Sequence, residues 1–229
     1  MNDPIQMILY FAAIILVIWA QTKVKGVYEH YSRVQSEKHI TGAQVARRIL
    51  DSHGLHHVEV QMSQNGVLSD HFDPRTNVVN LSPKVYNEDS IASVAVAAHE
   101  VGHAIQFAEN YSFIGIRNKL LPVAIVSGNL GWFVIIIGLI SNIMPIFYLG
   151  LAMLAMIALF QLVTLPVEFD ASGRALAILR NDGYLSEDEG ADAKSMLRAA
   201  ALTYVAALLA TLMQILRLVL MSQRGSRRR

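Results

Sequence analysis

The chain has 229 residues, of which 53% are hydrophobic and 16% charged, whereas an average soluble domain has about 25% charged residues. Its net charge is +1 and no basic stripe runs through its body, so we expect no nucleic-acid partner. There are no cysteines, which excludes disulfides, thiolate metal ligands and a cysteine nucleophile.

The first apolar segment covers residues 5–20 and contains one polar residue, Gln6. It ends at Trp19 and Ala20 and is followed by Lys23, an arrangement typical of the end of a membrane span. The residues before it include no Lys or Arg, unlike the basic start of a signal peptide. We therefore expect a retained transmembrane anchor.

A polar segment, residues 21–119, follows and is expected to form a small mixed domain. The expected elements are a helix capped by Thr41 that ends near His53, strands at 58–62 and 78–81, and a helix capped by Asp89 or Ser90. The turn signals Asn65-Gly66 and Asp73-Pro74 separate the two strands.

The second half of the chain alternates between apolar and polar segments. Residues 120–140 and 146–163 carry no charge and are separated by a short break, so 120–163 is predicted to be a transmembrane hairpin. A second polar segment, 164–198, follows it. Residues 199–221 form a fourth apolar segment that either spans the membrane or lies in its interface, and 222–229 form a basic tail.

The sequence His99-Glu100-Val101-Gly102-His103 lies in the second predicted helix of the first polar segment. Histidines four residues apart share one helix face, so both imidazoles can bind one Zn²⁺ ion, and Glu100 can reach a water molecule on that ion. This pattern predicts metal-assisted hydrolysis, in which Glu100 takes a proton from the water and passes it to the leaving amine.

A catalytic zinc site commonly has three protein ligands, and no histidine follows His103. Glu168 is the preferred third ligand, because two consecutive spans return the chain to the side of the membrane that it left. Asp170, His71 and Glu109 remain alternatives, and Asp170 is also a candidate for holding a ligating histidine in place.

With these motifs, nearly the whole chain resembles the YugP-type neutral zinc metallopeptidases, membrane proteins of gluzincin character. The resemblance is carried by four segments: residues 70–76, residues 81–86, residues 97–106 around the zinc motif, and residues 166–172 around Glu168. A more distant similarity links the chain to the HtpX-type membrane proteases. Those have an aspartate four residues after the glutamate ligand, where this chain has Ser172.

The resemblance implies a zinc metalloendopeptidase that acts on peptides or membrane proteins. By analogy with zincins, the strand formed by Val78, Val79, Asn80 and Leu81 would pair with an extended substrate backbone. A donor to the transition-state oxyanion would come from Tyr184, Arg174 or Arg180. The expected fold is mainly α and integral to the membrane, with three to four transmembrane helices and a small α+β zincin-like domain that the hairpin divides.

Two other functions remain open. One is a site-2-type intramembrane protease, in which the zinc helix is itself a membrane span. The segment Asn181-Asp182-Gly183 faintly resembles a later motif of those proteases. The other is a membrane adaptor that binds zinc without catalysis. The number of Lys and Arg at the span ends favours a multi-pass protein of the cell membrane with a cytoplasmic catalytic face. The arginines of the tail favour a cytoplasmic tail instead, and both conditions are met if residues 199–221 lie in the membrane interface.

Overall fold

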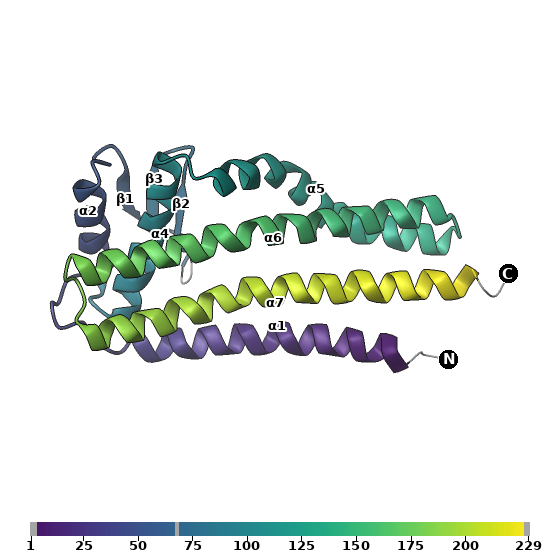
Figure 1. Cartoon of the computed structure of the whole chain (residues 1–229), viewed down its shortest axis with the longest axis horizontal. Coiled ribbons are helices and arrows are strands. Elements are labelled where there is room, and N and C mark those ends of the chain that lie inside the picture. The colour runs from purple at the N-terminus through teal and green to yellow at the C-terminus, as the bar shows by residue number, and fades with distance from the viewer. Residues whose placement is uncertain (1–3, 67–68, 227–229) are drawn as a thin grey trace. The chain divides into compact units, whose positions relative to one another are not determined.

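The computed structural model describes residues 4–66 and 69–226, which form seven helices and three short strands (Figure 1). The helices are α1 (Pro4–Tyr31), α2 (Gly42–Ser52), α3 (Pro83–Asn87), α4 (Ile91–Ala108), α5 (Ser112–Ile140), α6 (Met144–Asn181) and α7 (Glu187–Ser226). The strands are β1 (Glu59–Met62), β2 (His71–Asp73) and β3 (Val78–Leu81). The mainly helical fold is therefore confirmed, and residues 227–229 of the predicted basic tail lie outside the described residues.

The chain divides into two compact units. The apolar unit consists of residues 1–21, 115–165 and 203–229, and the mixed unit consists of residues 22–114 and 166–202. Four long helices, α1, α5, α6 and α7, continue from one unit into the other, because the backbone hydrogen bonding of a helix does not depend on whether its side chains are apolar.

The apolar unit contains most of the candidate membrane-spanning residues. In the described part of the chain four helices, α1, α5, α6 and α7, are long and apolar enough to cross a membrane, which confirms the prediction of three to four spans. Large apolar side chains such as Ile8, Phe133 and Leu162 are exposed, as expected for a surface that faces lipid. The zinc-motif helix α4 is not among these candidate spans.

The hairpin of α5 and α6 is closed by residues 141–143, a shorter connection than the sequence indicated. Its two helices approach closely at glycines. A Cβ atom on Gly150 would lie 2.8 Å from the backbone nitrogen of Ile135, so a larger residue there would push α5 away.

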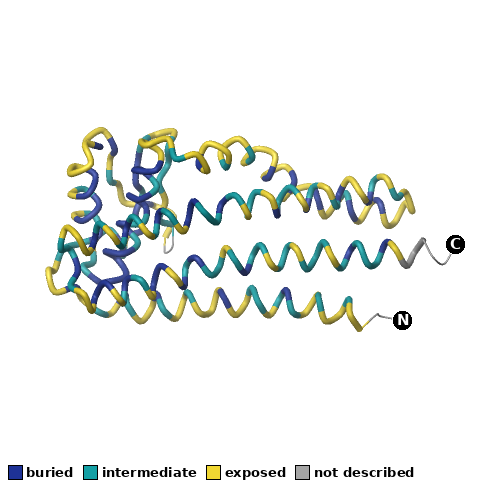
Figure 2. Tube along the Cα trace, in the orientation of Figure 1, coloured by how far each residue is buried: buried dark blue, intermediate teal, exposed yellow. Residues whose placement is uncertain are grey.

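The mixed unit is built around α4, whose buried residues pack against α2 and the sheet; Figure 2 shows these buried positions in dark blue. Ser90 caps α4 by accepting the backbone N–H of Ser93, and Thr41 and Gln44 form a capping box at the start of α2, so both predicted caps are confirmed. Gly54, just after α2, has a φ of +71°, a conformation that favours glycine at the end of a helix.

The three strands form a sheet in the order β1-β3-β2. β1 pairs with β3 in parallel, from Glu59 opposite Val78 to Met62 opposite Leu81. β2 pairs with the other edge of β3 in antiparallel orientation, with Phe72 opposite Val79. The sequence did not predict β2, which leaves β3 in the centre of the sheet.

Candidate metal centre

Two helices of the mixed unit bring three candidate metal ligands together. His99 and His103 lie one turn apart on α4, with ring centroids 4.7 Å apart. Their Nε2 atoms lie 3.4 Å and 3.8 Å from Oε2 of Glu168 on α6. One ligand atom from each residue lies within 4.8 Å of the others, and among the described residues this is the group that fits a metal ion.

The donor set fits zinc. Two imidazole nitrogens and one carboxylate oxygen are the ligands of a common class of catalytic zinc site, which keeps a further position open. Glu168 is 5% exposed, and a buried carboxylate is unfavourable unless it is paired or binds a cation. Burial by itself would lower the pKa of His103, but the hydrogen bond to Glu168 and the charge of Glu100 outweigh it and raise that pKa above its usual value.

The close approach of the two helices depends on Gly102, inside the zinc motif. A Cβ atom at this position would lie 2.8 Å from the carbonyl oxygen of Ala171 on α6, closer than packed atoms tolerate. Glycine therefore lets the backbone of α4 lie against the backbone of α6, which places Glu168 beside the two histidines.

We expect Gly102→Ala to destabilise the mixed unit by about 1–3 kcal/mol, since the added methyl group overpacks the contact with Ala171. Zinc affinity should fall with it, because the two ligand-bearing helices separate. Gly173→Ala is the matched control: it lies on α6, meets no atom within 4 Å and should stabilise its helix by up to about 1 kcal/mol. Thermal unfolding and zinc titration of both variants check this; equal behaviour would contradict it.

Each histidine is held in place through its other ring nitrogen. Nδ1 of His99 lies 3.2 Å from the hydroxyl oxygen of Ser172, and Nδ1 of His103 lies 3.0 Å from Oε1 of Gln106. An Nδ1–H that donates to these oxygens leaves the Nε2 lone pair of each ring directed to the metal. Ser172 therefore contacts the candidate ligand His99 from the position where HtpX-type proteases have an aspartate.

Gln106 connects His103 to a chain of polar groups. Its Nε2 donates to the carbonyl oxygen of Val167 at 2.9 Å and to Oδ2 of Asp170 at 2.7 Å. Asp170 in turn accepts from Nε of Arg174, whose Nη1 donates to Glu109 at 2.6 Å. Gln106 and Ser172 were missed as site residues. Ser172 meets His99 from 73 residues away, whereas Gln106 lies one helical turn after His103, a spacing that could have indicated their contact.

Replacing Gln106, which is fully buried, by alanine is expected to weaken zinc binding about 10–100-fold, the usual effect of removing a group that orients a metal ligand. A competitive chelator titration measures this. Since the same change leaves the carbonyl of Val167 without its donor, Ser172→Ala is a second variant that loosens His99 without disturbing that carbonyl. Unchanged zinc affinity in both variants would refute the orienting role.

Glu100 lies beside the metal group but is not part of it in the described residues. Its side chain is buried, with a residue exposure of 8%, and Oε2 accepts the backbone N–H of Phe72 at 3.2 Å. The N–H of Phe72 is therefore directed away from β3, so Phe72 and Val79 form a pair that is not joined by hydrogen bonds. As a result, the outer edge of β2 faces the carboxylate of Glu100.

The expectation that β3 pairs with substrate is wrong for this sheet. Residues Val78, Val79 and Asn80 have β1 on one side and β2 on the other, and the fourth predicted residue, Leu81, is paired with Met62. A strand with both edges occupied cannot accept another backbone; the unpaired edge nearest Glu100 belongs to β2.

The alternative third ligands have other contacts. Nδ1 of His71 lies 2.8 Å from the carbonyl oxygen of Ser69, and the ring is exposed. Glu109 and Asp170 both accept from Arg174, as described above. None of the three belongs to the metal group found among the described residues.

The candidate oxyanion donors are dispersed. Arg174 is held by its two carboxylates, and Arg180 lies near the end of α6. Tyr184 packs against the hydrophobic core of the mixed unit, where burial and the charge of Asp182 raise the pKa of its phenol. The segment Asn181-Asp182-Gly183 ends α6, and Gly183 has a φ of +66°, typical of a helix stop.

Comparison with known proteins gives two matches. Residues 6–223 match the family described as "Putative neutral zinc metallopeptidase". The chain is also 42% identical over 217 residues to the protein described as "Putative membrane protease YugP" of Bacillus subtilis (strain 168), covering 95% of this chain and 96% of that protein. No solved structure matches the chain.

Proposed function

Because the chain belongs to this neutral zinc metallopeptidase family, we propose that it is a membrane-bound zinc metalloendopeptidase of the gluzincin type. The zinc ligands would be His99, His103 and Glu168. The observation that carries the proposal is the convergence of their ligand atoms within 4.8 Å, next to the buried carboxylate of Glu100.

Zinc bound by these ligands would activate water for attack on a peptide carbonyl and polarise that carbonyl. Glu100 takes the proton from the water on Oε1, since Oε2 already accepts the Phe72 N–H. The same carboxyl group then gives the proton to the leaving amine, so that it acts first as base and then as acid. Ser172 and Gln106 keep the imidazole rings aligned through these steps.

An extended peptide would bind along the outer edge of β2. In the strand pairing, the N–H and C=O of Phe72 are directed away from β3 and toward the side of Glu100. A substrate backbone that added to this edge would place one of its peptide bonds beside the metal ligands. This mode of binding uses hydrogen bonds to the substrate backbone, so it suits unfolded or extended segments of many sequences.

The catalytic residues would face the cytosol. If all four candidate helices span the membrane, the mixed unit would lie on the side opposite to both termini. Most Lys and Arg near the candidate span ends belong to the mixed unit or lie next to it in sequence. Cytoplasmic loops carry such an excess of positive charge. Accessible substrates would then be cytosolic polypeptides and cytoplasmic loops of membrane proteins.

The test is zinc-dependent hydrolysis by the full chain in lipid nanodiscs, with unfolded casein as substrate. We expect new peptide amino termini, loss of cleavage after zinc is removed with a chelator, and recovery when zinc is returned. Mass spectrometry of the products identifies the cleaved bonds. Stoichiometric zinc binding with no cleavage of any unfolded substrate would favour the non-catalytic adaptor instead.

A site-2-type intramembrane protease has less support. Its zinc helix would have to cross the bilayer, whereas α4 is packed in the core of the mixed unit and is not among the candidate spans of the described chain. We therefore place cleavage outside the hydrocarbon layer.

A further inference from the structure

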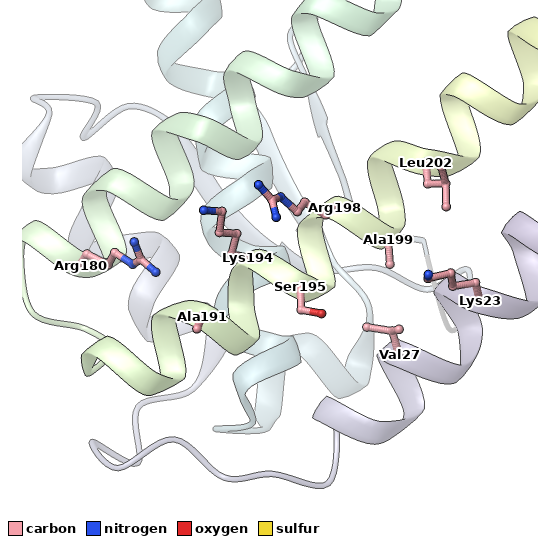
Figure 3. A pocket seen from close by; sticks show the side chains of 9 residues that line it. All are labelled: Lys23, Val27, Arg180, Ala191, Lys194, Ser195, Arg198, Ala199 and Leu202. Carbon is pink, nitrogen blue, oxygen red and sulfur yellow. The ribbon is translucent and has the colours of Figure 1, made fainter.

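A second feature of the mixed unit lies on α1, α6 and α7, apart from the metal ligands (Figure 3). It is a cavity of about 600 Å³, lined in part by Lys23, Arg180, Lys194 and Arg198. No acidic residue is among those that line it. A cavity of this size can hold a small ligand or the headgroup of a lipid.

The cationic side chains come together through the register of α7. Lys194 and Arg198 are one turn apart and project from the same side of the helix in Figure 3. Like charges at this spacing repel, which disfavours the arrangement unless an anion compensates them. Among the described residues, 4–66 and 69–226, no ion pair involves Lys194, Arg198 or Arg180.

The carboxylates closest in sequence have other partners. Asp192 accepts the hydroxyl of Tyr31 at 3.0 Å. Glu189 accepts the backbone N–H groups of Glu37 at 2.7 Å and of Ser186 at 2.8 Å. Neither Asp192 nor Glu189 forms one of the ion pairs found among the described residues.

Arg180 is positioned by a glycine. A Cβ atom on Gly190 would lie 2.6 Å from Nε of Arg180. Because Gly190 has no side chain, the side chain of Arg180 can pack against the first turns of α7. The cavity therefore has cationic side chains from three helices, and one of them, Arg180, packs against α7 at Gly190.

The end of the cavity at Lys23 also carries apolar side chains (Figure 3) and adjoins the apolar segments of the chain in sequence. It is lined by Val27, Ala199 and Leu202. Lys23 comes directly after the apolar residues 5–20, and Arg198 comes directly before the apolar residues 199–221. Residues at such borders lie at the level of the lipid headgroups.

We propose that this cavity binds the phosphate headgroup of an anionic phospholipid, with the phosphate against Lys194, Arg198 and Arg180 and the glycerol end against Leu202. Arginine and lysine are the usual ligands of phosphate oxygens, and the apolar end distinguishes a lipid from a free phosphate. Such a lipid would contact α1, α6 and α7 of the mixed unit.

The experiment titrates the detergent-solubilised full chain with short-chain phosphatidylglycerol and counts bound lipids by native mass spectrometry. The test variant is Lys194→Gln/Arg198→Gln. The matched control is Lys25→Gln/Arg33→Gln, which removes one Lys and one Arg that are exposed and do not line the cavity. Inorganic phosphate, phosphatidylcholine and an acidic peptide serve as competitors.

We expect one saturable phosphatidylglycerol site whose affinity falls about tenfold or more in the test variant and less than about twofold in the control. None of the three competitors should displace the lipid. Equal losses in both variants would show non-specific attraction to charge and overturn the proposal. Displacement by inorganic phosphate or by the acidic peptide would overturn it in favour of a soluble phosphate or a peptide site. Peptide hydrolysis does not enter this measurement, so its result is independent of the proposed catalysis.

Discussion

The Glu100→Gln protein is expected to keep its zinc and to lose peptidase activity by a factor of about 10² to 10⁴, the usual contribution of a positioned proton-transfer group. Glutamine has the shape of glutamate, and its amide oxygen can still accept the Phe72 N–H, so the local fold should be preserved. The amide cannot take a proton from water at neutral pH. The measurement is kcat on a fluorogenic peptide together with the zinc content of the purified protein.

Glu109→Gln is the matched control, because it makes the same chemical change at the C-cap of the same helix. Glu109 is exposed and its ion pair with Arg174 is of a kind that contributes little, so activity should change by less than about fivefold. If Glu100→Gln cleaves peptides as fast as the unaltered chain, Glu100 is not the base, and the protein is either an adaptor or an enzyme of another mechanism.

Replacing Glu168 by glutamine should weaken zinc binding by more than about 100-fold, beyond the range found for residues that only orient a ligand. The change removes the negative charge from the metal group and leaves the two histidines as the remaining members. Peptidase activity should disappear at zinc concentrations that saturate the unaltered chain. Competitive chelator titration gives the affinity, and X-ray absorption at the zinc edge counts the remaining ligands.

Asp170→Asn distinguishes Glu168 from its neighbour. Asp170 contacts Gln106 and Arg174, so its replacement should affect zinc only through the orientation of His103 and reduce affinity about 10–100-fold. A larger loss of zinc in Asp170→Asn than in Glu168→Gln would exchange the roles of these two carboxylates.

The features that the sequence predicted correctly depend on residues close together in the chain. Ser90 and Thr41 cap their helices through backbone groups three residues away. His99 and His103 share a face because of the helical repeat, and long uncharged runs identify the four candidate spans whatever surrounds them.

The features that could not be predicted depend on distant pairing. β2 has three residues and no alternation of its own, and it exists because β3 offers it an edge. Because β2 is present, β3 lies in the centre of the sheet. The free edge on which substrate would bind is then that of β2 instead of β3. In the same way, Gln106 gives no sign of its contact with Asp170 until α4 lies against α6.

The end of an apolar segment is not the end of its helix. The apolar part of α6 stops near residue 163, but the helix continues without interruption to Asn181 and carries Glu168 and Ser172. The proposed third ligand is therefore on the continuation of a candidate membrane span rather than on a separate polar segment.

This continuity has a consequence for the synthesis of the protein. The ribosome makes α4 first, then the hairpin, and Glu168 only afterwards, so a nascent chain that stops before Pro166 carries two of the three ligands. The metal group is completed only when both spans of the hairpin have been translated and are available to the insertion machinery. On the proposed ligand set, the peptidase would therefore stay inactive until both helices of the hairpin have been made.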